Sequence, residues 1–180
     1  LFKKSRILFG LNYCRRRIAK DRKAIIVEGQ IDALRLIYEG LNIVVAGQGT
    51  AFGEGHVKEL VNLGVNEVFL ALDSDPPGQE AAFKIGNLFQ KEGIETKVVN
   101  MPKGHDPDSL LREKGIQGFI EIVKNSHDYV TFMVQHQSKF LNVNTPAGKS
   151  ELVHALSKQI RDWPDSVMVH ESLKKLAHLL

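Results

Sequence analysis

Cysteine is almost absent from this chain. The one cysteine among its 180 residues, Cys14, excludes an intramolecular disulfide and a zinc site built from several cysteines. The chain also lacks an apolar run near the roughly 20 residues of a membrane-spanning helix, and no signal-peptide pattern opens it. We therefore expect a cytoplasmic protein with no membrane partner. The first residue is Leu1 rather than Met, so we also expect a piece of a longer protein.

The charge is distributed unevenly along the chain. Residues 1–24 hold nine of the 24 Lys and Arg residues but one of the 21 Asp and Glu residues, which leaves 15 basic and 20 acidic residues in the remainder. A basic segment beside an acidic pocket suits a polyanion that docks next to a metal site. A solvated, mobile basic end is an equally good interpretation of the charge alone.

Short apolar strands alternate with helical patterns in the first part of the sequence. The predicted strands span residues 24–27, 42–46, 67–72 and 96–101. The predicted helices between them span 31–38, 54–63 and 79–91. Such strands, apolar along their whole length, indicate an α/β protein with a mainly parallel four-stranded sheet covered on both faces.

No further strand is predicted beyond about residue 107. Helical patterns cover residues 109–113, 119–124, 129–140, 148–160 and 167–179. Thr145 and Pro146 have the residue types of an N-cap and a first helical position. We expect a C-terminal helical bundle.

Acidic residues follow three of the predicted strands. They are Glu28 with Asp32, Asp73 with Asp75, and Asp106 with Asp108. Side chains at the carboxyl ends of neighbouring parallel strands converge in one crevice. Each cluster alone is equally typical of a turn or a helix N-terminus. Three together favour a site for Mg²⁺ or Mn²⁺, which bind oxygen ligands, and metal-assisted chemistry on phosphates.

A glycine-rich turn at residues 47–53 precedes a predicted helix and could hold a phosphate. It lacks P-loop spacing, so this signal is weak by itself.

These motifs resemble a known family. Glu28-Gly29 with Asp32, followed by Asp73-x-Asp75, is similar to the TOPRIM fold of bacterial primases, topoisomerases and some nucleases. Three stretches narrow the resemblance to bacterial DNA primases of the DnaG type: residues 4–11, residues 49–51 (Gly-Thr-Ala) and residues 104–110, which contain Asp106-Pro107-Asp108. The resemblance covers about residues 2–119 and continues more loosely through the helices.

The resemblance implies the RNA polymerase core of a primase, which joins NTPs into a short RNA primer on a single-stranded DNA template in the bacterial cytoplasm. It implies two or more Mg²⁺ or Mn²⁺ ions. Zinc and the replicative helicase would bind domains absent from this chain. The expected parts are a basic lead-in (1–23), a TOPRIM domain (24–118) and a helical appendage (119–180). Alone, the chain is expected to be inactive or weakly active.

The resemblance also implies roles for individual residues. Metal ligands would be Glu28, Asp73 and Asp75 near the catalytic ion, with Asp32, Asp106 and Asp108 toward a second ion. Glu28 could instead act as a general base. Lys4 matches a basic residue beside the active site, and Lys3, Lys4 and Arg6 would contact nucleic acid. Two departures affect the loop after Asp73: Ser74 replaces a glycine, and Pro76-Pro77 replaces a stretch containing a basic residue.

Other functions remain open from the residues alone. A phosphatase could use Asp73 as its nucleophile, and a nuclease could use the same acids. A non-catalytic module could dock nucleic acid through the basic segment. A topoisomerase needs a nucleophilic tyrosine, and none of Tyr13, Tyr38 and Tyr129 stands in a recognisable setting.

Overall fold

A six-stranded sheet forms the centre of the protein, with its strands in the order β1-β3-β2-β4-β5-β6. The computed structural model describes residues 7–47 and 52–180. The strands are β1 (Leu8–Phe9), β2 (Lys23–Val27), β3 (Val44–Gly47), β4 (Glu67–Leu70), β5 (Glu95–Val98) and β6 (His127–Asp128). The four central strands are parallel, as predicted, whereas β1 and β6 pair antiparallel at the two edges.

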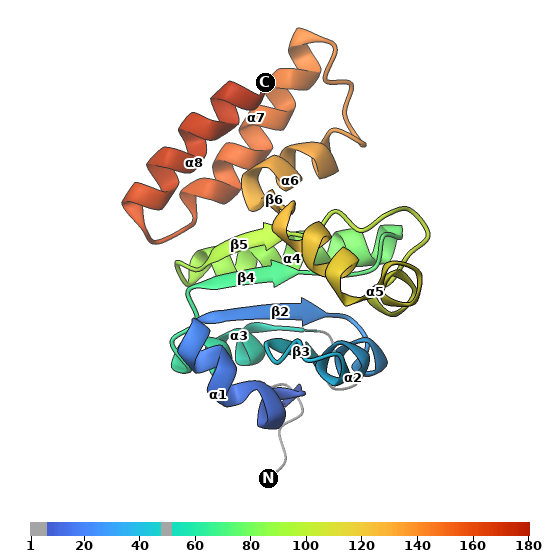
Figure 1. Cartoon of the computed structure of the whole chain (residues 1–180). Coiled ribbons are helices and arrows are strands. Elements are labelled where there is room, and N and C mark those ends of the chain that lie inside the picture. The colour runs from blue at the N-terminus through green and yellow to red at the C-terminus, as the bar shows by residue number, and fades with distance from the viewer. Residues whose placement is uncertain (1–6, 48–51) are drawn as a thin grey trace.

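Helices cover both faces of the sheet (Figure 1). The helices of this part are α1 (Leu11–Asp21), α2 (Gln30–Tyr38), α3 (Glu54–Asn62), α4 (Pro76–Lys91) and α5 (Pro107–Lys124). Alternate strand residues point to opposite layers: Val44 and Ala46 pack with α2 and α5, whereas Val45 packs with α1, α3 and α4. The predicted α/β layers are therefore confirmed.

Three further helices, α6 (Tyr129–Gln137), α7 (Pro146–Arg161) and α8 (Ser166–Leu179), form the C-terminal bundle. The bundle packs on the α4 side of the sheet, and its buried residues join the same hydrophobic core. The indole N–H of Trp163 donates to Oδ1 of Asn87 in α4 over 2.9 Å. Thr145 caps α7 as predicted, since its hydroxyl accepts from the Gly148 N–H over 3.1 Å.

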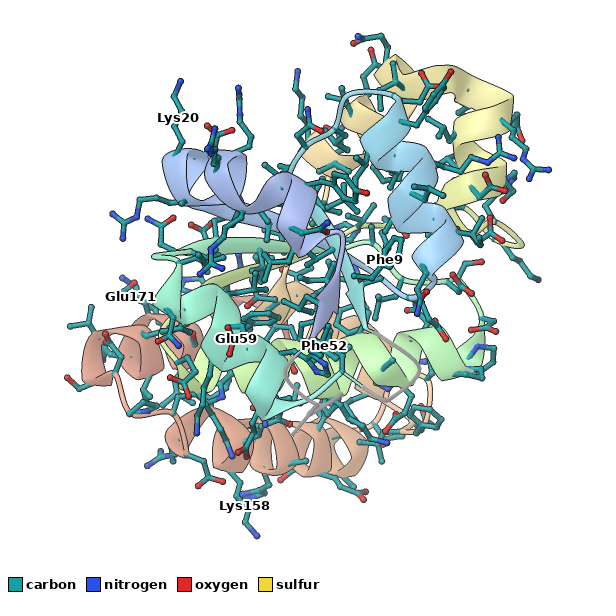
Figure 2. All side chains as sticks on the ribbon, turned by 90° about the horizontal axis from the view of Figure 1, so that it is seen from below. Phe9, Lys20, Phe52, Glu59, Lys158 and Glu171 are labelled. Atoms are coloured by element: carbon teal, nitrogen blue, oxygen red, sulfur yellow. The ribbon has the colours of Figure 1, made fainter. Side chains whose placement is uncertain are left out.

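Two details differ from the sequence prediction. The edge strands β1 and β6 were not expected; each has two residues, too few to show an alternating pattern. The interpretation of the basic segment as a solvated, mobile end does not hold for α1, because Cys14 and Ile18 are buried in the core. Its charged face is visible in Figure 2, where Lys20 projects away from the molecule. The two helices predicted at 109–113 and 119–124 are confirmed, because α5 is interrupted between them at Gly115, whose φ of 65° and ψ of 178° are not helical.

None of the helices in the described residues is long and apolar enough to cross a membrane.

Candidate functional site

The strand order brings the three acidic clusters to one end of the sheet, where the central parallel strands have their carboxyl ends. β2 and β4 are neighbours, with Ile26 opposite Leu70, and β4 and β5 are neighbours, with Leu70 opposite Val98. The arrowheads of these three strands point the same way in Figure 1. The segments that carry the acids therefore leave the sheet side by side, at the end where open α/β sheets bind ligands.

Asp32 links two of these segments. It lies in the first turn of α2 and is 9 % exposed. Its Oδ2 accepts a hydrogen bond from the Gly29 N–H over 3.1 Å, and its Oδ1 accepts from the Asp108 N–H over 3.2 Å. The carboxylate thus fixes the start of α2 against the start of α5.

Asp75 and Asp106 are both helix N-caps. Oδ1 of Asp75 accepts from the Gly78 N–H over 2.8 Å, and Oδ1 of Asp106 accepts from the Ser109 N–H over 2.7 Å. A short polar residue is favoured at this position because it satisfies one of the free N–H groups of the first turn. In the described residues the second carboxylate oxygen of Asp75 and of Asp106 has no hydrogen-bond partner, so each can still bind a ligand.

Asp73 lies where β4 has ended and α4 has not begun. A Cβ at Gly78 would stand 2.4 Å from the Asp73 carbonyl oxygen, so only glycine lets the helix approach this closely. Oδ1 of Asp73 is buried and has no hydrogen-bond partner in the described structure. A buried carboxylate oxygen without a partner is costly, which is consistent with a place for a cation.

The acids raise one another's pKa. Burial, followed by repulsion from Glu28, Asp106 and Asp75, raises the pKa of Asp73 to about 6. Burial and repulsion from Asp106 raise the pKa of Asp32 to about 6 against the opposing hydrogen bond from Asp108.

Glu28 and Asp106 shift in opposite directions. The pKa of Glu28 is raised by desolvation, then by Asp75 and Asp32. The pKa of Asp106 is lowered, chiefly by its hydrogen bond from the Ser109 N–H. Perturbed carboxylates that repel one another at the end of a sheet are typical of functional sites.

Asp108 differs from the other acids because it has cationic partners. Its Oδ1 lies 3.1 Å from Nε of Arg35 and its Oδ2 lies 2.5 Å from a terminal nitrogen of Arg112. It would have to leave at least one arginine to bind a metal ion.

The candidate ligands are all carboxylate oxygens, which suit a hard divalent cation. These side chains are not gathered closely enough to surround an ion by themselves. Among residues 7–47 and 52–180, no group of three or more His, Cys, Asp and Glu side chains is close enough to hold a metal ion. Mg²⁺ commonly binds through one or two carboxylates and completes its shell with water and substrate phosphates. The oxygen-only set and the unpartnered Oδ1 of Asp73 fit such a shared site.

Some predicted residues lie outside the described structure. These are Lys3, Lys4 and Arg6, and the Gly49-Thr50-Ala51 part of the glycine-rich turn.

The structure adds one residue that the sequence marked only as a departure from the family. Oγ of Ser74 accepts a hydrogen bond from the Gly104 N–H over 2.9 Å, and the Ser74 N–H donates to the His105 carbonyl over 3.4 Å. Ser74 therefore joins the loop that carries Asp73 and Asp75 to the loop that carries Asp106.

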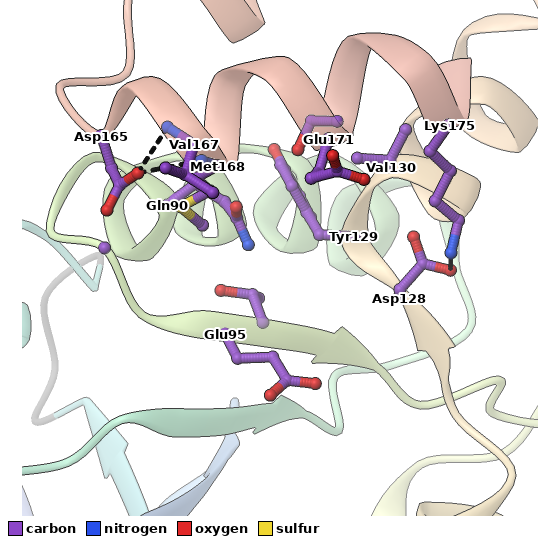
Figure 3. A pocket seen from close by; sticks show the side chains of 13 residues that line it. Gln90, Glu95, Asp128, Tyr129, Val130, Asp165, Val167, Met168, Glu171 and Lys175 are labelled. Carbon is purple, nitrogen blue, oxygen red and sulfur yellow. Dashed lines mark hydrogen bonds and ion pairs between the residues drawn. The ribbon is translucent and has the colours of Figure 1, made fainter. Parts of the chain in front are cut away.

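A separate cavity lies between α8 and β5 (Figure 3). Its wall includes Asp128, whose carboxylate lies 2.7 Å from Nζ of Lys175 on α8. None of the six acids predicted as metal ligands lines it, so it is not part of the acidic site.

Comparison with known proteins agrees with this fold. Residues 25–111 match a family model described as Toprim-like, and this region holds most of the four central strands and all six acids. The protein is therefore a Toprim-domain protein. Residues 130–180 match a second model, described as the DnaB-helicase binding domain of primase.

One curated relative and two solved structures narrow the class of Toprim-domain protein. The DNA primase of Chlamydia pneumoniae is 48 % identical over 180 residues, which are 100 % of this chain and 30 % of the relative. A DNA primase domain from Pseudomonas aeruginosa has a TM-score of 0.88 at 25 % identity, over 99 % of this chain and 56 % of that one. The structure of a DnaG primase catalytic domain bound to ssDNA has a TM-score of 0.87 at 25 % identity, over 98 % and 58 %. This chain belongs to the bacterial DNA primase family.

The comparisons also bear on the extent of the chain. It spans about 30 % of the length of the curated relatives that it matches first. The match over residues 130–180 contradicts the expectation that a helicase-binding region is absent, because it covers α7, α8 and all of α6 except Tyr129. Helical patterns alone could not reveal this, since they indicate packing rather than a partner.

Proposed function

We propose that this chain is part of the RNA polymerase core of a bacterial DNA primase, which synthesises short RNA primers on single-stranded DNA in the cytoplasm by metal-dependent nucleotidyl transfer. One observation carries the proposal: the segments after β2, β4 and β5 bring acidic residues together at one end of the sheet, where burial and then repulsion from neighbouring carboxylates raise the pKa of Asp32 and Asp73 to about 6. A bound divalent cation would offset this burial and repulsion.

In this proposal Glu28, Asp73 and Asp75 hold the first Mg²⁺ or Mn²⁺ ion, and Asp32, Asp106 and Asp108 lie toward a second. When bound, such ions stabilise the charge that develops on the α-phosphate of an NTP as a primer 3′-hydroxyl displaces pyrophosphate.

The chain's own part is to position the oxygens. Gly78 and Ser109 each fix one oxygen of an N-cap carboxylate and leave the other available. Ser74 keeps the loops that carry Asp75 and Asp106 at a constant separation.

The remaining assignments extend the same proposal. Lys4 would be a catalytic residue, and Lys3, Lys4 and Arg6 would contact the nucleic acid. The template, the NTPs and the RNA primer would meet at the acids, and α6, α7 and α8 would contact the replicative helicase. Residues 1–23, 24–118 and 119–180 would form the lead-in, the TOPRIM domain and the helical appendage.

A chimaera tests this function. We would replace the matching segment of the Chlamydia pneumoniae primase, which is 48 % identical, with this chain and measure primer synthesis on single-stranded DNA. We expect activity from the chimaera, at least a hundredfold loss with Asp73→Asn, and little change with the exposed Asp162→Asn. A hundredfold loss corresponds to roughly 3 kcal/mol of transition-state stabilisation, which is the size expected when an ion that stabilises the transition state loses a ligand. Priming by the Asp73→Asn chimaera at the unsubstituted rate would refute the role of Asp73.

Metal binding by the chain itself is a separate test. Electron paramagnetic resonance of Mn²⁺ should show binding that Asp73→Asn weakens, and added NTP should strengthen it. If Mn²⁺ binds equally to both chains, the acids at the end of β4 do not hold the ion.

A further inference from the structure

A polar groove lies beside the acidic site, on the far side of Ser74. We call it the lysine groove; it encloses about 500 Å³ and is lined by Ser74, Gln79, Asn100, Pro102, Lys103 and Lys139, together with buried Met101. Ser74 lies in the β4–α4 segment and Gln79 in the first turn of α4, whereas residues 100–103 lie in the β5–α5 loop and Lys139 follows α6. The groove therefore exists only when the bundle is packed on the sheet.

The two lysines of the groove are free to bind an anion. Lys103 and Lys139 are exposed, and neither forms an ion pair with any described residue. Elsewhere in the described structure, Lys23, Lys84, Lys97 and Lys175 each pair with a carboxylate. The carboxamides of Gln79 and Asn100 add neutral donors to the same wall.

The helix beside the groove cannot supply the anion site, so the lysines must. Pro76 and Pro77 open α4 and have no N–H. The Gly78 N–H is taken by the Asp75 carboxylate and the Gln79 N–H by the Asp75 carbonyl. The free N–H groups that make many helix N-termini anion sites are therefore absent or already bonded here.

The groove adjoins the acidic site at one residue. Ser74 lines both the groove and the small cavity formed by Asp73, Asp75, Gly104, His105 and Asp106. The lysines of the groove therefore lie on the other side of Ser74 from the acids. A ligand with phosphates spaced along its length could place one phosphate at the acids and a neighbouring one at the lysines.

The ring of Phe140 lies next in sequence to Lys139 and is 69 % exposed. Proteins bind single-stranded nucleic acids through exposed aromatic rings, on which bases stack, and through cations that contact the backbone. Phe140 does not line the groove itself, and its ring packs edge-on against His136.

We propose that the lysine groove binds the phosphodiester backbone of a single nucleic-acid strand as the strand passes the acidic site. This inference rests on the proposed function, because it assumes that a nucleic-acid strand passes the acids. The test measures binding to the groove and does not depend on activity at the acids. The shared chemistry is a chain of phosphodiesters, which a DNA template and an RNA product both offer.

The experiment measures oligonucleotide binding by the full 180-residue chain. Fluorescence anisotropy would follow labelled oligo-dT and oligo-U of about 12 nucleotides, within the usual site size for such surfaces, over a series of salt concentrations. The test variant is Lys103→Ala with Lys139→Ala. The control variant, Lys91→Ala with Lys158→Ala, changes the net charge equally; Lys158 projects from α7 on the opposite side to Lys20 in Figure 2.

We expect the test variant to bind about tenfold more weakly at low salt. Its slope of log K against log salt should be shallower by about 1.4, since two phosphate contacts are lost at roughly 0.7 each. The control should keep the slope of the unsubstituted chain. Phe140→Ala should weaken binding about fivefold or more without changing the slope, because stacking releases no counterions.

Weaker binding of dT alone assigns the groove to the template, and weaker binding of U alone assigns it to the product. Equal losses in test and control variants, unchanged slopes, no oligonucleotide binding by the unsubstituted chain, or a loss confined to ATP or pyrophosphate would overturn the proposal. Mn²⁺ binding should be unchanged in the test variant and weakened in Asp73→Asn, so failure of the groove and failure of the acidic site are distinguishable.

Discussion

At the residue scale, Asp73 combines its proposed role as a metal ligand with a cost in stability. Its raised pKa, about 6, lies above the usual value near 3.9 of an unfolded chain. The folded protein therefore holds this proton more tightly than the unfolded chain does, and ionisation of Asp73 destabilises the fold as the pH rises through about 6. The cost is absent below about pH 4, where both states are protonated.

We therefore predict that Asp73→Asn raises the stability of the chain without metal by roughly 1 kcal/mol at pH 8, after allowance for solvent screening. At pH 4 the difference should nearly vanish. Urea unfolding at the two pH values, in the presence of a chelator, measures both. A lower midpoint for the variant at pH 8 would mean that Asp73 is not repelled by its neighbours.

Asp108 is the matched contrast, because its carboxylate lies against Arg35 and Arg112. Asp108→Asn should lower stability by about 1 kcal/mol at pH 8, since both arginines lose an ionic partner. The same substitution at two nearby acids is thus expected to have opposite signs.

The sequence predicted which acidic residues meet at the end of the sheet better than it predicted their contacts. An acid after an apolar strand is visible in the order of residues, so all six carboxylates were identified. The pair of Asp108 with Arg112 is spaced four residues apart on α5 and could have been found. The pair with Arg35, or the bond from Ser74 to Gly104, joins segments far apart in the chain and follows no local pattern.

At the element scale, the loops that carry the acids depend on Ser74. Ser74→Ala should cost about 1 kcal/mol, the usual net value of a hydrogen bond, and should speed hydrogen exchange at the Gly104 N–H. Nuclear magnetic resonance and urea unfolding give the two readouts. Ser150→Ala, at an exposed position on α7, is the control and should change neither.

The contact between α4 and the bundle depends on a glycine. A Cβ at Gly86 would lie 2.1 Å from the ring of Tyr129, which is 1 % exposed and donates its hydroxyl to the Phe83 carbonyl over 2.5 Å. Gly86→Ala should therefore lower the free energy of unfolding by about 1–3 kcal/mol through overpacking.

Tyr129→Ala opens the space and supplies the control for Gly86→Ala. In this background, Gly86→Ala should cost less than it does alone, so a double-mutant cycle should show a coupling of about 1 kcal/mol or more. Additive losses would mean that the methyl group and the ring do not meet.

Elements with strong patterns were predictable, and short or highly charged ones were not. The central strands and most helices were found from apolar runs and helical spacing. Helix α1 was hidden because it is rich in arginine and buries only Cys14 and Ile18, four residues apart. Such a narrow apolar face resembles a solvated segment in sequence.

At the scale of the whole molecule, one ion pair joins the outermost helix to the edge of the sheet. Burial by itself would raise the pKa of Asp128, but hydrogen bonds from Lys175 and Thr131 outweigh it and lower the pKa below its usual value. A lowered pKa contributes stability above the unfolded value near 4, and that stability is lost as the pH falls through the folded value.

We predict that Lys175→Met lowers the free energy of unfolding by about 0.5–1 kcal/mol at pH 7, as for a partly exposed ion pair. At pH 2 the difference should be smaller, because this stability is lost as the pH falls through the lowered pKa of Asp128. Urea midpoints at both pH values test this, with Lys158→Met as a control of equal charge. A difference of the same size at pH 2 would assign the effect to packing of the side chain.

The strand order has a consequence for how the protein is made. Because β2 lies between β3 and β4, and β5 lies beyond β4, the acids are brought together from segments that leave the ribosome at different times. A nascent chain that has emerged only as far as α4 can pair β2 with β4, but it has no Asp106 to crowd Asp73 and Asp32. The repulsion that Asp106 adds therefore arises only when β5 and the loop after it dock, whereas the repulsion between Glu28 and Asp73 is present before then. A divalent ion present in the cell at that moment would favour the docking of β5, and so would assist the completion of the fold as well as its later chemistry.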